Sequence, residues 1–220
     1  MRAGSDRWRD DTGDRRPVAA RSDGRTEPRR RFLILHGWQN HRPVGHWQRW
    51  LAERLTAAGH DVCYPQLPDP EFPVLKDWLA ATEQALARAP GAEQAVVAHS
   101  LSCVTWLHLA RQGSVHLPVG RVLLVAPPGP RFLAETAELR GFQLPTDALD
   151  VIHSGSLAVP RLVCADNDRY CQPPADAVYG RLCDVDRVNG AGHLDMAAGY
   201  GRWLSALRWC EDATYRLNAE

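Results

Sequence analysis

The sequence predicts a doubly wound α/β fold, with a mainly parallel sheet of about six strands and helices on both faces. Short apolar runs alternate with amphipathic segments from Arg31 to the end of the chain. Several of these runs are apolar throughout, without polar residues in alternation, and a strand of that kind is buried on both faces, as in a parallel sheet covered by helices. We therefore expect catalytic groups beyond the carboxyl ends of the strands.

Each expected element has a local signal. The run "RFLILHG" predicts a buried strand; apolar residues then recur at Trp47, Trp50, Leu51 and Leu55, the spacing of one helix face, until Gly59 ends the pattern. The other expected elements follow in chain order: a strand at "DVCYP", a helix over 75–86, a strand at "QAVVAHS", a helix at "LSCVTWLHLARQ", strands at "RVLLVAP", "RLVCAD" and "CDVDRVN", a helix around 174–182, and a final helix over 203–210.

Length and composition fit one globular domain. A chain of 220 residues with 45% apolar content can bury a sizeable core. Residues 1–30 have dense mixed charge and almost no aliphatic side chains, so they are expected to form a disordered Arg-rich extension before a domain over 31–220. Ten arginines and six acidic residues lie within 1–31, which leaves 32–220 with a net charge of −4. The domain therefore offers no basic face for nucleic acid.

The sequence also lacks the signals of membrane, secreted and metal-binding proteins. No run approaches the roughly 18 apolar residues of a membrane span, and the N-terminus has no apolar secretory segment. We therefore expect a cytoplasmic protein without membrane contact. The six cysteines form no C-x-x-C pair and no spacing suited to zinc, so free thiols are expected, with no metal and no other cofactor.

Ser100 is the expected nucleophile. It follows an apolar strand and precedes a helix that begins at Leu101, so a sharp turn would lift its hydroxyl out of the sheet. The usual pattern at such a turn is G-x-S-x-G, because close chain contacts demand small residues. Ala98 and Ser102 occupy the two glycine positions here. Taken alone, a serine before a helix can also be an N-cap.

Two backbone N–H groups are expected to bind an oxyanion beside Ser100. The N–H of Leu101 lies at the positive end of the following helix dipole. The loop "HGWQN" after the first strand is expected to supply the second donor, since Gly37 lets the backbone turn so that the N–H of Trp38 or of Gln39 faces the serine.

His193 is the expected general base. It lies in the glycine-rich loop "NGAGHLD" after the last strand, and the unperturbed pKa of histidine, about 6.5, suits proton transfer near neutral pH. A carboxylate should hold its tautomer. The loop "CADNDRYCQP" offers Asp166 and Asp168; Asp168 lies further out and is preferred, with Asp166 as the alternative. Asp195 is expected to cap the turn after His193.

The sequence resembles the α/β-hydrolase superfamily, and within it the small serine hydrolases related to retinoblastoma-binding protein 9 and bacterial YdeN. The resemblance covers most of residues 32–215, and it rests on "LHGWQNHRPVGHWQRWL", "VVAHSLSCVTWL", "LLVAPP", "ADNDRYC" and "GAGHL". It implies a triad of Ser100, Asp168 and His193, in the Ser, Asp, His order of α/β-hydrolases. The sequence departs from the pattern of this family at the two missing glycines and at Arg169, where proline is common.

The 33 residues between Pro127 and Val159 form a long connection between two strands, and we interpret 127–159 as a lid or a packed insertion. Its apolar residues Phe132 and Phe142, with Trp38, are candidates to line a substrate pocket. Leu133 and Leu144 are further candidates.

The expected function is hydrolysis of a small ester, thioester or activated amide through an acyl-enzyme on Ser100, with a small-molecule acyl substrate. One alternative is a catalytically weak member that acts as a protein-interaction module. Another is a lyase, which would need further acid or base groups in the pocket.

Overall fold

A computed structural model of the protein describes residues 29–88, 94–113, 119–144 and 153–218. Residues 1–28 of the predicted extension lie outside the described residues. The strands are Arg31–Leu35 (β1), Asp61–Cys63 (β2), Gln94–His99 (β3), Arg121–Val125 (β4), Arg161–Cys164 (β5) and Asp184–Arg187 (β6). The α-helices are Trp47–Ala57 (α1), Leu75–Ala87 (α2), Leu101–Gln112 (α3), Pro130–Glu135 (α4), Ala175–Tyr179 (α5) and Leu204–Glu211 (α6). The 3₁₀ helices include Ala137–Phe142 and Gly180–Leu182.

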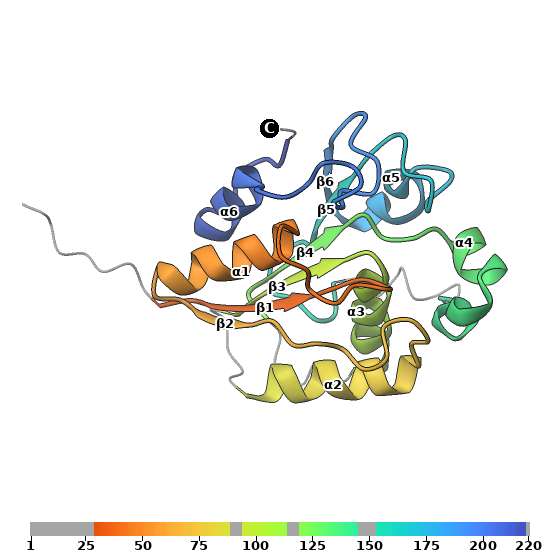
Figure 1. Ribbon diagram of the computed structural model, residues 1–220, viewed down its shortest axis with the longest axis horizontal. Coiled ribbons are helices and arrows are strands. Elements are labelled where there is room, and N and C mark those ends of the chain that lie inside the picture. Colours follow the sequence, from red (N-terminus) through yellow and green to blue (C-terminus); the bar gives the residue numbers. More distant parts are fainter. Residues whose placement is uncertain (1–28, 89–93, 114–118, 145–152, 219–220) are drawn as a thin grey trace, which may run out of the picture.

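The described strands form one six-stranded sheet in the order β2-β1-β3-β4-β5-β6 (Figure 1). Every neighbouring pair is parallel. Leu35 pairs with Ala98 and His99 pairs with Val125, so β1, β3 and β4 end at the same edge of the sheet. The predicted doubly wound α/β fold is confirmed.

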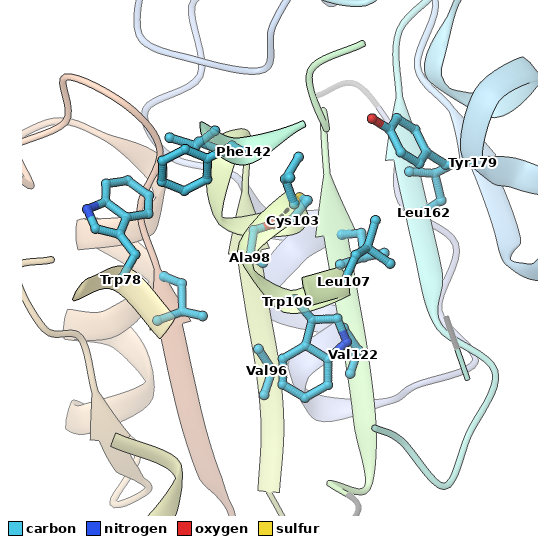
Figure 2. Close-up of a cluster of buried hydrophobic side chains, with 14 of the residues drawn as sticks. Trp78, Val96, Ala98, Cys103, Trp106, Leu107, Val122, Phe142, Leu162 and Tyr179 are labelled. Atoms are coloured by element: carbon cyan, nitrogen blue, oxygen red, sulfur yellow. Dashed lines mark hydrogen bonds between the residues drawn. The ribbon is translucent and has the colours of Figure 1, made fainter. Parts of the chain in front are cut away.

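Helices cover both faces of the sheet. In Figure 1, α1 and α6 lie on one face, and α2 and α3 lie on the other. Phe32 and Ile34 pack in the cluster under α1 and α6, whereas Leu33 and Leu35 pack in the cluster under α2 and α3. Figure 2 shows the second cluster, with Trp106 of α3 among the side chains of β3 and β4. Both faces of β1 are buried from Phe32 to Leu35, which explains why these four residues are all apolar.

Glycines end two of the predicted helices where the sequence indicates. After α1, Gly59 has a φ of 87°. Gly113 caps α3 with a φ of 67° and a ψ of 16°, the left-handed conformation that glycine adopts without steric cost. None of the described helices has the length and apolar character needed to span a bilayer.

The two ends of the described chain are tied to the body of the fold. Arg30, which the sequence analysis placed in the extension, donates to the backbone carbonyls of Cys210 and Glu211 at the end of α6. Near the other end, the buried carboxylate of Asp186 on β6 accepts a hydrogen bond of 2.8 Å from the N–H of Leu217. Asp186 also pairs with Arg161 and Arg216. These contacts hold the C-terminal segment against the sheet.

Candidate active site

The candidate site lies where the chain reverses its direction of progress across the sheet. β1 and β3 are neighbours, but the chain leaves them towards opposite edges, with β2 beside β1 and β4 beside β3. Such a switch point opens a crevice at the carboxyl ends of the two strands. The loop 36–40 follows β1 and Ser100 follows β3, so both face this crevice.

Ser100 stands in a strained turn. Its φ of 54° and ψ of −122° lie outside the regions that serine adopts readily. The backbone N–H donates to the carbonyl of Val125 at 2.8 Å, which ties the turn to β4. Ser100 precedes α3 in the N-cap position, but its side chain makes no capping hydrogen bond. The hydroxyl therefore does not serve the N-cap role that a serine before a helix often has.

The hydroxyl of Ser100 lies instead beside His193. Its Oγ is 2.9 Å from Nε2 of His193, and Nδ1 of the same ring is 2.8 Å from Oδ2 of Asp168. A carboxylate only accepts hydrogen bonds, so Nδ1 donates and Nε2 is left to accept from the serine. Oδ1 of Asp168 accepts from the N–H of Tyr170 at 2.9 Å, which fixes the orientation of the buried carboxylate. The structure thus brings together three residues that lie in separate loops of the sequence.

Asp166, the alternative carboxylate, has a different contact. Its Oδ1 accepts from the N–H of Gly190 at 2.7 Å, and Oδ1 of Asn167 accepts from the N–H of Gly192 at 2.7 Å. These side chains hold the loop that carries His193, a role that the sequence did not indicate. Asp195 accepts from the N–H of Ala198 at 2.9 Å, as a turn cap does.

The loop after β1 presses closely on Ser100. A Cβ atom added to Gly37 would lie 2.8 Å from Cβ of Ser100. Of the two candidate donors in this loop, the N–H of Gln39 donates to the carbonyl of Pro70 at 2.8 Å, so it is already engaged. Within the described part of the chain, the N–H groups of Trp38 and Leu101 donate to no protein acceptor. The geometry therefore favours Trp38 over Gln39 as the partner of Leu101.

A cavity of about 260 Å³ opens beside Ser100 and His193. Its apolar wall includes Trp38, Phe132 and Tyr170, whose rings follow one another: centroids are 6.2 Å apart from Trp38 to Phe132 and 4.9 Å apart from Phe132 to Tyr170. The wall continues with Leu139 of the 3₁₀ helix. Asn40, His46 and Asp195 are among the polar lining residues.

Phe142 does not reach this cavity, which corrects the sequence analysis. Its side chain is fully buried in the cluster under α2 and α3, where its ring meets Trp78 edge to face at 5.6 Å (Figure 2). The 3₁₀ helix turns Phe142 towards α2 while Leu139 lines the cavity. Leu133 is likewise buried in this cluster, and Leu144 packs against its rim. The rest of the connection includes residues 145–152, which lie outside the described residues.

Three further histidines surround the site in neutral form. Burial lowers the pKa of His36 and of His46 to about 4. Burial also holds the pKa of His99 well below its usual range, and Nε2 of this ring lies 3.1 Å from the carbonyl of His193, to which it donates.

Among the described residues, no cluster of three or more His, Cys, Asp or Glu side chains is arranged to hold a metal ion.

Comparisons with known proteins agree with the fold. The family model for serine hydrolases matches residues 32–210. YdeN of Bacillus subtilis (strain 168), which is named as a hydrolase, is 30% identical over 97 residues, 44% of this chain and 50% of that protein. The aligned region thus spans half the length of this curated relative. The crystal structure of the ydeN product matches with a TM-score of 0.67 and 21% identity, over 81% of this chain and 95% of that chain.

Other solved structures share the fold at lower identity. A YdeN-like hydrolase of Pectobacterium atrosepticum matches with a TM-score of 0.59 and 19% identity, over 84% of this chain and 91% of that chain. FphF, a fluorophosphonate-binding serine hydrolase of Staphylococcus aureus, matches with a TM-score of 0.57 and 15% identity, over 86% of each chain.

Proposed function

Because this chain belongs to the serine hydrolase family and is YdeN-like within the α/β-hydrolase superfamily, we propose that it hydrolyses a small ester, thioester or activated amide through an acyl-enzyme on Ser100. The proposal rests on the chain of contacts through His193, which lies 2.8 Å from Asp168 and 2.9 Å from Ser100. A nucleophile, a base within hydrogen-bond distance and a carboxylate that orients the base are the parts that acyl transfer requires.

In the proposed acylation, Oγ of Ser100 attacks the carbonyl carbon while its proton passes to Nε2 of His193. The electron pair of the carbonyl double bond moves to oxygen, and the N–H groups of Leu101 and Trp38 donate to this oxyanion. Asp168 keeps the imidazole in the tautomer that accepts a proton at Nε2, and it stabilises the imidazolium that forms.

Collapse of the tetrahedral intermediate completes the acylation: the bond to the leaving group breaks, and the leaving group takes the proton from His193. In deacylation, water attacks the acyl-enzyme while His193 accepts its proton, and a second tetrahedral intermediate forms. When this intermediate collapses, the bond to Oγ of Ser100 breaks, the acid departs, and Oγ takes the proton from His193. Every proton in this scheme moves between Ser100, His193, water and the substrate.

The cavity suits a small substrate. Its volume of about 260 Å³ lies just below the range of ligand pockets, which run from roughly 300 to 1,000 Å³. Trp38, Phe132 and Leu139 would pack against an apolar part of the substrate. The connection that carries Phe132 and Leu139 would act as a pocket wall, and as a lid if it moves.

The experiment that tests this function is labelling with a fluorophosphonate, read by intact mass. The serine oxygen forms a bond to phosphorus as the P–F bond breaks, and the serine proton passes to His193. We expect one adduct on the wild type and none on Ser100→Ala or His193→Ala. An adduct that persists on Ser100→Ala would contradict the assignment, and a folded wild type that takes no label would favour the interaction module instead.

Two carboxylate variants separate the alternatives at the third position. Asp168→Asn should slow labelling by about 10³- to 10⁴-fold, because the amide favours the wrong imidazole tautomer. Asp166→Asn weakens only the support of the His193 loop and should slow labelling by about tenfold or less. A larger loss in Asp166→Asn than in Asp168→Asn would reverse the assignment.

A further inference from the structure

The residue two positions after Ser100 has its own contact with the oxyanion loop. Ser102 occupies the position where the usual turn has glycine, and its side chain is fully buried in the first turn of α3. Its hydroxyl donates to the backbone carbonyl of His36, which lies 66 residues earlier, just past the end of β1. A glycine at this position would leave α3 without this link to the loop.

The imidazole ring of His36 makes two further hydrogen bonds. Its Nδ1 donates to the carbonyl of Gly37 at 2.8 Å, and its Nε2 accepts from the N–H of Leu67 at 2.8 Å. This arrangement needs a neutral ring, with one nitrogen as donor and the other as acceptor. Burial lowers the pKa of His36 to about 4, so the ring is neutral at pH 7. The hydroxyl of Ser102 thus joins a fixed set of hydrogen bonds.

The position of this loop decides where the oxyanion donor lies. Gly37 follows His36 directly, and it approaches Ser100 so closely that an added Cβ would lie 3.3 Å from Oγ. Trp38 is the next residue, and its N–H is the proposed donor. A shift of the His36 peptide therefore moves that N–H relative to Ser100, and a displacement of about 1 Å in a catalytic group can cost about 10²-fold in rate.

We propose that Ser102 is a positioning residue, which acts through the carbonyl of His36 to set the oxyanion loop at its working distance from the nucleophile. The inference rests on the proposed acyl transfer at Ser100. Ser102, which replaces the second glycine of the usual turn, then contributes to the reaction, and restoring that glycine should lower the rate.

The test compares Ser102→Ala and Ser102→Gly with the wild type and with Thr105→Val. Thr105 is a matched control because it is also buried in α3, and its hydroxyl donates within the helix, to the carbonyl of Leu101 at 3.3 Å. Three quantities are measured: the fluorophosphonate labelling rate, kcat and KM on a p-nitrophenyl ester, and the inhibition constant of a short trifluoromethyl ketone. The last forms an anionic adduct whose oxygen occupies the oxyanion position.

We expect both Ser102 variants to lose about 10- to 100-fold in kcat and in labelling rate, with KM within about twofold of wild type. The inhibition constant of the ketone should rise by the same factor as kcat falls. Thr105→Val should stay within about twofold of wild type in all three quantities. A purely structural role for Ser102 would lower the melting temperature without this separation of kcat from KM.

The other outcomes overturn the inference in distinguishable ways. Equal rates in the wild type and both folded Ser102 variants would refute the positioning role alone. Unfolding of both variants would also refute it, in favour of a role in the fold. If only the alanine variant fails to fold, the glycine variant gives the same comparison. A folded wild type that takes no label overturns the inference together with the proposed function.

Discussion

Replacing Gly37 with alanine tests whether the contact between the loop after β1 and the nucleophile turn is as tight as the structure indicates. The backbone of Gly37 is not in the left-handed region, so alanine can adopt it without strain. The added Cβ would nevertheless lie 2.8 Å from Cβ of Ser100 and 3.4 Å from the carbonyl oxygen of His99. The effect of the substitution is therefore purely steric.

The size of the effect follows from these distances. Carbon atoms in contact prefer separations of about 3.5 to 4.0 Å, so the loop and the turn must separate by roughly 1 Å. Cβ of Ser100 is attached directly to a strained backbone, which leaves it little freedom to rotate away. A misplacement of that size can cost about 10²-fold in rate, and overpacking typically costs about 1–3 kcal/mol in free energy of unfolding.

The assay is the fluorophosphonate labelling rate, together with urea denaturation. Gly37→Ala should label about 100-fold more slowly than wild type while it remains folded. Gly141→Ala is the matched control, because a Cβ there meets no atom within 4 Å. A labelling rate within about threefold of wild type in folded Gly37→Ala would refute the argument that this contact positions the loop.

Three further predictions concern two buried histidines, a buried ion pair and the wall of the pocket. The pKa values of His36 and His46 fall from 6.5 to about 4 on folding, so the unfolded chain binds more protons than the folded protein between these two pH values. The free energy of unfolding should therefore decrease as pH drops from 6.5 to 4, by roughly 3 kcal/mol for each residue. Urea denaturation at pH 7.5 and 4.5 measures this, and equal stabilities would contradict it. Asp186→Ala should lower the free energy of unfolding by about 3 kcal/mol, because buried Arg161 loses its nearer carboxylate and keeps only the exposed Asp184 at 3.8 Å; a loss below about 1 kcal/mol in urea denaturation would show that the ion pair with Asp186 is dispensable. Phe132→Ala should raise KM for apolar acyl esters about tenfold with little change in stability, whereas Phe142→Ala should cost about 3–5 kcal/mol and leave KM unchanged; the reverse pattern would place Phe142 in the pocket.

The fold could be predicted because its signals are local. A strand buried on both faces shows a continuous apolar run, as β1 does from Phe32 to Leu35, and the helix that follows shows its buried face at regular spacing. The glycines after α1 and α3 mark where those helices end. Ser100, Asp168 and His193 could be singled out for the same reason, since each lies in a loop that follows a predicted strand, in an order that indicates a function.

The sequence could not distinguish residues whose roles depend on long-range contacts. Phe132 and Phe142 lie in the same connection and look equivalent as apolar residues, yet only Phe132 lines the cavity. Trp38 and Gln39 are adjacent in one loop, and the carbonyl of Pro70 engages the N–H of only one of them. Asp168, unlike Asp166, lies beside the imidazole of His193.

The sequence by itself therefore determined the strand and helix order and the loops that carry the chemistry. Hydrophobic periodicity and turn residues act over a few positions and are visible along the chain. The tertiary structure decided which side chains and N–H groups point into the site, and it revealed the bond from Ser102 to the carbonyl of His36. Those contacts join segments tens of residues apart, and their distances are fixed only when helices pack on both faces of the sheet and bring the ends of β1 and β3 together.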